Sequence, residues 1–99
     1  MYYAIIGRDK DDSLALRMAA RPVHLSRLEA LKDAGQLLIA GPFPAIDGND
    51  PGPAGFSGSL IVAEFDSLEQ ATEWAHADPY AQQGVFKEVS VLPFKKVLP

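Results

Sequence analysis

The stretch GSLIVAEFDSLEQ, residues 58–70, contains the strand-to-helix transition that decides the fold. Residues 58–65 are mostly apolar and are bounded by glycine and an acidic residue, so they predict a β-strand. Ser67 precedes Gln70 by three residues, which is the spacing of a capping box at the start of a helix. Apolar residues then recur at helical spacing and predict an amphipathic helix over residues 68–77.

The residues after this helix predict a second strand. Asp78-Pro79 ends the helix, because a residue that precedes proline is pushed out of the helical conformation. A short turn over residues 80–84 leads to residues 85–94, where valines alternate along one face and predict a strand. Residues 95–99 are expected to form a loose tail.

The first part of the chain shows the same order of patterns. Residues 2–7 form a continuous apolar run, which is typical of a strand buried on both faces. Residues 13–34 are rich in Ala, Leu, Arg and Lys and predict a helix, with Ser13 placed to cap its first turn. Gly35 is expected to end this helix in the left-handed conformation.

Pro22 interrupts this predicted helix. Proline has no N–H and crowds the preceding turn, so we expect a kink, or a short first helix that ends near Ala20. His24 would then follow directly after the break.

A strand is predicted over residues 36–40, before Gly41-Pro42 ends it. The segment 41–57 contains four of the eight glycines and four of the eight prolines, and it predicts a long loop. Long loops in small folds often border functional sites.

The predicted order is strand, helix, strand, strand, helix, strand, which is that of a ferredoxin-like α+β fold with a four-stranded antiparallel sheet. Both helices of such a fold cover the same face of the sheet. The apolar runs at residues 2–7 and 58–65 indicate that the other face is covered too, so we expect a homodimer that packs sheet against sheet.

Composition excludes several functions. A chain of 99 residues fits one domain, which spans residues 1–99. The net charge of −4 and the scattered basic residues argue against a nucleic-acid partner. The absence of cysteine excludes disulfides and thiolate chemistry. The N-terminal apolar run is too short for a signal peptide or a membrane span, so we expect a cytoplasmic protein with no membrane partner.

His24 is the first candidate for chemistry, since no phosphate-binding glycine loop, paired-histidine metal helix or Gly-x-Ser-x-Gly elbow occurs. An imidazole titrates near neutrality and can act as an acid or a base. Position alone favours a simpler role, a partly exposed helical histidine that packs on neighbouring side chains.

Asp78 is the second candidate, because a carboxylate beside an imidazole would fix its tautomer and stabilise the charged ring. The structural alternative is strong here as well. Asp at a cap position followed by Pro at the first helical position is a common way to start a helix. Spacing does not show whether His24 and Asp78 meet.

Other polar residues are weaker candidates. Ser57 and Ser59 flank Gly58 where the loop re-enters the sheet, and a hydroxyl there could receive an anionic or phenolic oxygen. Arg21 could bind a carboxylate with two hydrogen bonds, although a solvated arginine is more common. His76 could compete with His24 but is predicted to be exposed.

Three aromatic residues, Trp74, Phe43 and Tyr80, are expected to line the core or a pocket wall rather than bind a cofactor.

The sequence resembles the YciI-like (YCII-related) family over essentially its whole length. No position that carries the resemblance departs from the family pattern. These positions are Met1-Tyr2-Tyr3, Arg21 with His24-Leu25, Ala40-Gly41-Pro42 with Ala45-Ile46-Asp47, Gly55-Phe56 with Gly58-Ser59, Asp78-Pro79-Tyr80, Gly84-Val85 and Pro93-Phe94-Lys95-Lys96.

This resemblance implies a ferredoxin-like domain that dimerises as in the dimeric α+β barrel proteins, with a cleft beside a family histidine and aspartate. These correspond to His24 and Asp78, which we therefore expect to be catalytic. A relative resembling the family acts as a dehydrochlorinase on chlorinated hydroxyquinols and is thought to use such a pair. No metal or cofactor is expected, and the expected ligand-binding residues are Arg21, Gly41, Pro42, Ser59 and Tyr80.

Two functions remain open on this basis. The first is a small-molecule enzyme that performs an elimination, an isomerisation or a hydrolysis, with His24 moving a proton and Asp78 orienting it. The second is a noncatalytic ligand-binding or dimerisation module, in which the same residues form a structural hydrogen bond and a helix cap. The oxygen-using chemistry of other dimeric α+β barrel proteins is a third, weaker possibility, because only two histidines and no cysteine could bind a haem or metal.

Overall fold

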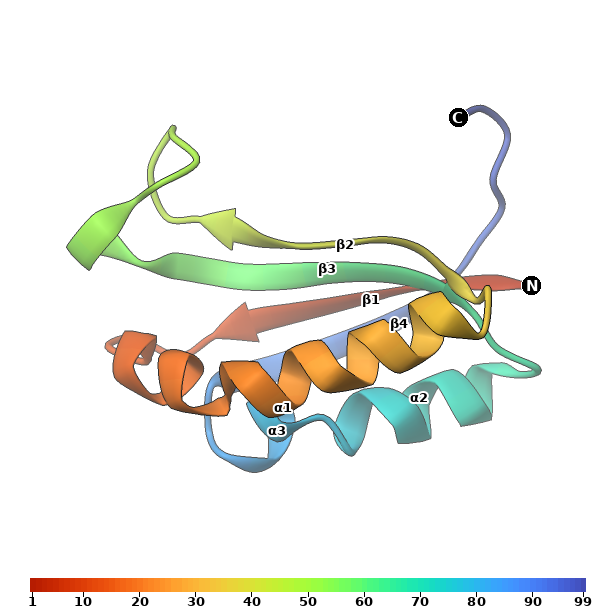
Figure 1. Ribbon diagram of the computed structural model, residues 1–99, viewed down its shortest axis with the longest axis horizontal. Helices are drawn as coiled ribbons and strands as arrows, with labels where there is room; N and C mark the ends of the chain where they lie inside the picture. The colour runs from red at the N-terminus through yellow and green to blue at the C-terminus, as the bar shows by residue number, and fades with distance from the viewer.

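Two strand–helix–strand units build the chain, and the computed structural model describes all residues from 1 to 99 (Figure 1). No helix is both long enough and apolar enough to cross a membrane. The elements are β1 (Tyr2–Asp9), α1 (Leu14–Asp33), β2 (Leu37–Pro44), the 3-10 turn η1 (Gly52–Ala54), β3 (Phe56–Glu64), α2 (Leu68–His76), the short helix α3 (Pro79–Gln82) and β4 (Phe86–Phe94).

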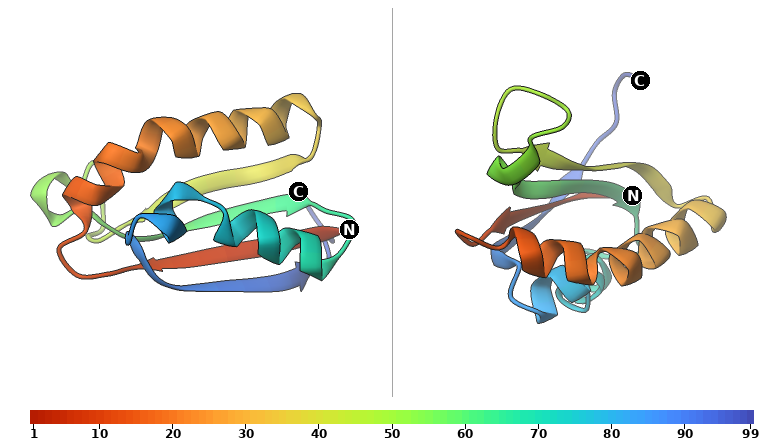
Figure 2. Two further views of the ribbon diagram at one scale, coloured as in Figure 1. Left: turned by 90° about the horizontal axis from the view of Figure 1, so that it is seen from below. Right: turned by 60° about the vertical axis from the view of Figure 1, so that its left-hand side comes forward.

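The four strands form one antiparallel sheet in the order β2-β3-β1-β4. Helices α1 and α2 cover one face of this sheet, and the opposite face carries no helix (Figure 2). The strand order and the one-sided helix layer confirm the predicted ferredoxin-like α+β fold.

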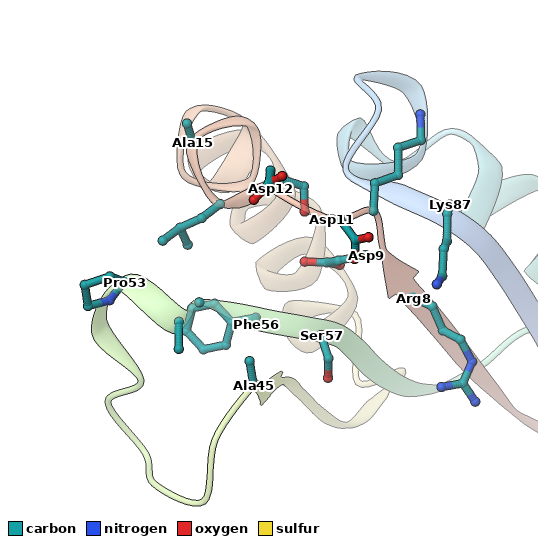
Figure 3. Close-up of a pocket in the computed structure, with 15 residues that line it drawn as sticks. Arg8, Asp9, Asp11, Asp12, Ala15, Ala45, Pro53, Phe56, Ser57 and Lys87 are labelled. Atoms are coloured by element: carbon teal, nitrogen blue, oxygen red, sulfur yellow. The ribbon is translucent and has the colours of Figure 1, made fainter.

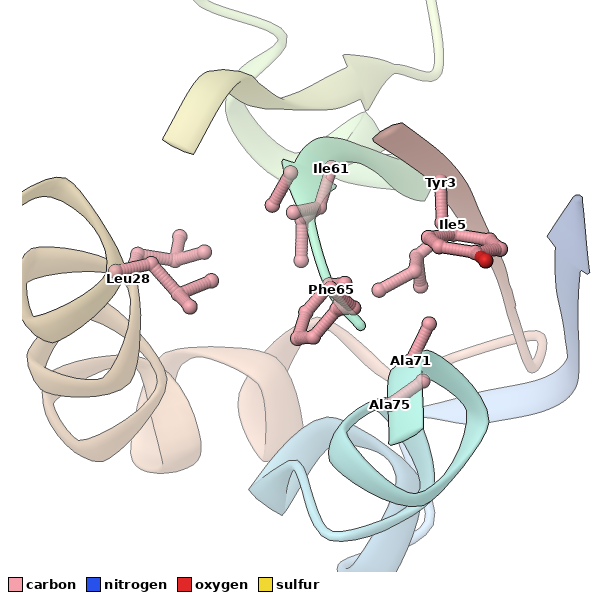
Figure 4. Packing of buried hydrophobic residues seen from close by; sticks show 9 residues of the cluster. Tyr3, Ile5, Leu28, Ile61, Phe65, Ala71 and Ala75 are labelled. Carbon is pink, nitrogen blue, oxygen red and sulfur yellow. The ribbon is translucent and has the colours of Figure 1, made fainter. Parts of the chain in front are cut away.

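The hydrophobic core lies between the sheet and the two long helices (Figure 4). In β1 the buried side chains Tyr3 and Ile5 alternate with the half-buried Tyr2, Ala4 and Ile6. The prediction that this strand is buried on both faces is therefore wrong for the single chain, because the helices cover only one face. The cluster consists of Tyr3, Ile5, Leu28, Leu31, Ile61, Ala63, Phe65, Ala71 and Ala75.

Helix α1 continues through Pro22, so the predicted helix end near Ala20 is wrong. Proline leaves the carbonyl of the residue four positions earlier, Met18, without its N–H partner. Both Pro22 and Met18 are exposed, so water can bind that carbonyl. The buried face of the helix, on both sides of the proline, outweighs the local preference for a break.

Strand β2 runs through Gly41-Pro42 to Pro44, four residues beyond the predicted end. Pro42 lies opposite Ser59 on the neighbouring strand. Because β2 is an edge strand, a residue without an N–H can stand there when its nitrogen faces outward. The predicted loop over residues 41–57 is accordingly shorter, and part of it forms η1.

The two predicted helix caps differ in outcome. Ser67 has an extended backbone (φ −155°, ψ 162°), and its hydroxyl accepts a hydrogen bond from the N–H of Gln70 at 3.1 Å, which confirms the predicted cap. Ser13 stands at the start of α1, but its ψ of 5° is not that of a typical cap residue and its side chain makes no capping bond. The short helix α3, which starts at Pro79, overlaps the predicted turn over residues 80–84.

Strands β1 and β3 approach each other closely at a point where both carry glycine. A Cβ atom on Gly58 would overlap the backbone carbonyl of Gly7, and a Cβ atom on Gly7 would overlap the ring of Phe86. The pairing of these two strands therefore requires glycine at position 58. Any larger residue there would push away the backbone of β1, whereas at position 7 only the side chain of Phe86 would have to move.

Gly58→Ala is expected to lower the free energy of unfolding by about 3 kcal/mol, because the new methyl group displaces a central strand. Gly41→Ala is the matched control, since Gly41 is also in a strand and has no atom near an added Cβ, and its effect should stay below about 0.5 kcal/mol. Urea denaturation of both variants measures the difference. Equal unfolding midpoints would show that Gly58 does not set the strand spacing.

Candidate functional site

The centre of the site is a buried pair formed by His24 of α1 and Asp78, which precedes α3. Nδ1 of His24 lies 2.9 Å from Oδ1 and 3.0 Å from Oδ2 of Asp78. The two side chains are 7% and 3% exposed. An ionised carboxylate can only accept hydrogen bonds, so Nδ1 carries the proton and donates it. The structure thus brings together two residues whose contact could not be derived from spacing.

Asp78 has this position because it also caps α3. Its backbone is extended, Pro79 follows at the first helical position, and its Oδ1 accepts a hydrogen bond from the N–H of Tyr80 at 2.9 Å. The same carboxylate therefore caps α3 and pairs with His24.

Arg27 completes the surroundings of Asp78. Its Nη1 donates to Oδ2 of Asp78 at 3.0 Å, and its Nη2 donates to the carbonyl of Trp74 at 2.8 Å. Burial by itself raises the pKa of the Asp78 carboxyl. The hydrogen bond and charge of His24, the N–H of Tyr80 and the charge of Arg27 outweigh burial, so that the pKa lies below its ordinary value of 3.8.

The imidazole of His24 is fixed on its flat side by Tyr80. The two rings are stacked with centroids 3.9 Å apart and planes 14° apart. Nε2 of His24 makes no hydrogen bond within the chain, and no fully enclosed side-chain nitrogen or oxygen lacks a partner. Nε2 therefore faces open space, in a cavity that His24 lines.

A second buried charged pair lies two turns earlier on α1. Arg17 donates to both oxygens of Asp9 at 2.8 Å and to the hydroxyl of Ser59 at 3.0 Å. Sequence reasoning missed Arg17 and Asp9, because an arginine on a polar helix and an aspartate at a strand end usually face solvent. The available signal was the seven-residue spacing of Arg17 and His24, which places them on the same face of a helix.

The cavity beside Nε2 has a volume of about 210 Å³ and lies between α1 and the sheet. Every residue predicted to bind ligand lines this cavity. Asp78 does not line it, because it lies behind His24. A second hollow of about 410 Å³ shares four of its lining residues, Arg17, Arg21, Pro42 and Tyr80. The cavity is lined by Arg17, Arg21, His24, Leu25, Leu28, Ala40, Gly41, Pro42, Ser59, Leu60, Ile61 and Tyr80.

Four other candidates lie elsewhere. His76 is exposed, as predicted, and Ser57 lines a different hollow. Trp74 packs against Phe65 in the core. Phe43 is 37% exposed and lies outside the cavity, so only Tyr80 of the three aromatic candidates forms its wall.

The largest hollow, about 580 Å³, lies at the end of β1 and around the start of α1 (Figure 3). Charges of both signs surround it, including Asp11, Asp12 and Lys87. Its one buried carboxylate, Asp9, already has both oxygens bonded to Arg17. No group of three or more His, Asp or Glu side chains is arranged to hold a metal ion. The smaller cavity, beside the unpartnered Nε2, is therefore the candidate site.

Comparison with known proteins shows which family the chain resembles. Residues 1–95 match the YCII-related domain. Protein YciI of Escherichia coli O6:H1 (strain CFT073) is 60% identical over 97 residues, which cover 98% of this chain and 99% of that protein. An uncharacterized protein of Haemophilus influenzae (strain Rd) is 48% identical over 97 residues, with the same coverage.

A solved structure is also similar over almost its full length. It is the 5-chloro-2-hydroxyhydroquinone dehydrochlorinase of Burkholderia phenoliruptrix AC1100, in complex with 2,5-dihydroxybenzoquinone. The two chains are 28% identical and superpose with a TM-score of 0.83, covering 96% of this chain and 94% of that one.

The lowered pKa of Asp78 predicts acid sensitivity. At a pH between the pKa of Asp78 in the folded chain and its unfolded value of 3.8, the unfolded chain binds more protons than the folded chain. The stability that Asp78 contributes is therefore complete above about pH 4. It is lost as the pH falls through the pKa of the folded chain. Asp78→Asn should cost about 2 kcal/mol at pH 7, from the lost charged hydrogen bonds. Urea unfolding of both proteins at pH 6 and near pH 3 should show this difference shrinking with acid. A difference that stays constant would contradict the assignment.

Proposed function

The chain belongs to the YCII-related domain family, and we propose that it is an enzyme that acts on a small molecule by proton transfer through His24. One observation carries this proposal. Asp78 holds Nδ1 of a buried histidine while Nε2 faces a cavity of about 210 Å³. A histidine with one nitrogen fixed by a carboxylate and the other free is arranged as a general acid–base.

In the proposed mechanism, Nε2 of His24 removes a proton from a substrate bound in the cavity. The ring then carries a positive charge, which the adjacent Asp78 carboxylate stabilises without taking the proton. The stack on Tyr80 keeps Nε2 pointed at the substrate by preventing rotation of the ring. The proton leaves from Nε2 to solvent or returns to the substrate at another atom.

Elimination is the reaction that we favour. The similar dehydrochlorinase, 28% identical with a TM-score of 0.83, removes chloride from a hydroxylated ring. In such a step His24 takes the proton, the electron pair that the proton leaves behind forms a double bond, and chloride departs with the electrons of the C–Cl bond. Isomerisation or hydrolysis would use the same first step at His24.

The protein is further proposed to act as a homodimer formed through the open face of the sheet. The strand registers place Ile39 opposite Val62, and Leu92 opposite Ala4, on the face that carries no helix. Ile39 and Leu92 are 57% and 53% exposed in the single chain. Apolar side chains spread over all four strands would form a hydrophobic interface with a second copy.

The helix cap formed by Asp78 supports the alternative, a noncatalytic ligand-binding module. Asp78 accepts hydrogen bonds from the backbone of Tyr80 and from Arg27 as well as from His24. A carboxylate with these partners stabilises the fold whether or not a reaction occurs. Loss of stability on changing Asp78 therefore does not distinguish the two functions, whereas loss of turnover on changing His24 does.

His24→Asn should lower kcat for chloride release from 5-chloro-2-hydroxyhydroquinone by roughly 100-fold or more, because general-base catalysis contributes about that much. His76→Asn is the matched control, since His76 is exposed and lies outside the cavity, and it should leave kcat unchanged. Chloride release measured at equal enzyme concentration compares them. Turnover that survives His24→Asn in a folded protein would favour the noncatalytic module.

Leu92→Asp should convert the dimer to a monomer at micromolar concentration, because two charges would be buried in the interface. Val23→Asp is the control, since Val23 is 58% exposed on helix α1, away from the open face. Sedimentation velocity gives the mass of each variant. A monomeric unmodified chain, or a dimer that tolerates Leu92→Asp, would contradict this interface.

A further inference from the structure

Arg17 and Asp9 form a buried charged pair that the proton-transfer step does not use. Their side chains are only 4% and 3% exposed. Replacing such a pair with apolar residues is often neutral or stabilising, so its presence beside a cavity calls for a role other than stability.

The guanidinium of Arg17 is held rigidly by its neighbours. Nε and Nη2 donate to the two oxygens of Asp9, and Nη2 also donates to Ser59. The ring centroids of Phe56 and Tyr80 lie 5.4 Å and 4.6 Å from its central carbon. These contacts fix both the plane and the direction of the guanidinium.

One end of this group is not held by Asp9 or Ser59. Nη1 of Arg17 donates to neither Asp9 nor Ser59, and its one other polar neighbour within the chain is the hydroxyl of Tyr80, which lines the same cavity. No fully enclosed side-chain nitrogen lacks a partner. Arg17 lines both the cavity beside His24 and the adjoining hollow of about 410 Å³, so Nη1 is accessible from the space that these two hollows occupy. The Ser59 hydroxyl accepts from Arg17 and keeps its own proton free to donate.

The charge around the cavity is positive although the chain carries a net charge of −4. Three arginines, Arg17, Arg21 and Arg27, lie at or directly behind its wall, against the two carboxylates Asp9 and Asp78. Among these side chains the arginines exceed the carboxylates by one positive charge. This local excess would attract an anionic ligand.

We infer that Arg17 is the anion-binding residue of this cavity, and that its ligand is a small planar molecule with an ionised enolate, phenolate or carboxylate oxygen bound at Nη1. This inference rests on the proposed function in one respect, that substrate occupies the cavity beside His24. The central carbon of Arg17 and the ring centroid of His24 lie 4.6 Å and 3.9 Å from the ring centroid of Tyr80, so one small ring can contact both groups. Nη1 then binds the ionised oxygen while Nε2 of His24 takes a proton from another atom of the ligand.

The test compares the affinities of an anionic and a neutral ring for the full chain by calorimetry at pH 7. The probes are 2,5-dihydroxybenzoquinone, whose acidic hydroxyls are ionised, and hydroquinone, which is neutral. Arg17→Met is made together with Asp9→Asn, so that no unpaired carboxylate remains buried. This double variant leaves the net charge unchanged. Arg8→Met is the control for removing an arginine outside the cavity, because Arg8 is 60% exposed and pairs with Glu88.

The unmodified chain and Arg8→Met should bind the anionic probe more tightly than the neutral one. The double variant should lose roughly 10- to 100-fold of its affinity for the anion, as expected when charge-assisted hydrogen bonds are removed, with little change for hydroquinone. A double variant that keeps the preference for the anion, or an unmodified chain without that preference, would overturn the inference.

If the double variant does not fold, the NMR signals of the Arg17 Nη groups in the unmodified chain show whether the anionic probe binds at Arg17. The anionic probe should shift them and hydroquinone should not, and unchanged signals at a saturating concentration of the anion would overturn the inference. These experiments involve no turnover. Arg17-dependent binding without a catalytic effect of His24 would reject the proposed function alone, and turnover without Arg17-dependent binding would reject only the anion site.

Discussion

The position of one buried carboxylate, that of Asp78, determines how the helices meet around the site. It accepts hydrogen bonds from His24 and Arg27 of α1 and from the backbone of Tyr80 in α3. Arg27 in turn donates to the carbonyl of Trp74 in α2. A carboxylate can accept several hydrogen bonds at once, so the Asp78 side chain joins α1 and α3, and Arg27 extends this connection to α2. The same bonds place Tyr80 against His24 and leave Nε2 facing the cavity.

The polar residues of the site divide the buried interior. The main cluster of nine hydrophobic residues lies under α1 and α2, and a cluster of three, Ala20, Tyr80 and Val85, lies beside α3. The buried residues of α1 follow in the order Arg17, Ala20, His24, Leu28 and Leu31, so His24 separates the two clusters and Arg17 lies beyond the smaller one. A chain of 99 residues has a small core, and burying charges costs several kcal/mol per ion before pairing offsets it. Two such pairs next to one cavity are more readily explained by function than by stability.

The prolines show where local patterns mislead. Pro22 predicts a helix break and Pro42 predicts a strand end, yet α1 and β2 continue through both. In each case the surroundings reduce the cost of the missing N–H, because Pro22 faces solvent and Pro42 stands on an edge strand. Whether a backbone position faces water depends on the neighbouring elements, which a local pattern does not describe. The Ser67 cap is predicted correctly because it involves residues only three positions apart.

The sequence by itself determined the order of strands and helices, the ferredoxin-like topology, and His24 and Asp78 as the residues to consider. These follow from apolar periodicity, capping and residue chemistry, all of which act over a few positions. Only the tertiary structure decided that His24 and Asp78 are in contact, and that Arg17 turns inward to Asp9 and Ser59. The residues of these pairs are 54, 8 and 42 positions apart in the chain. Their distances are set by how the helices pack on the sheet, and that packing depends on the whole core at once.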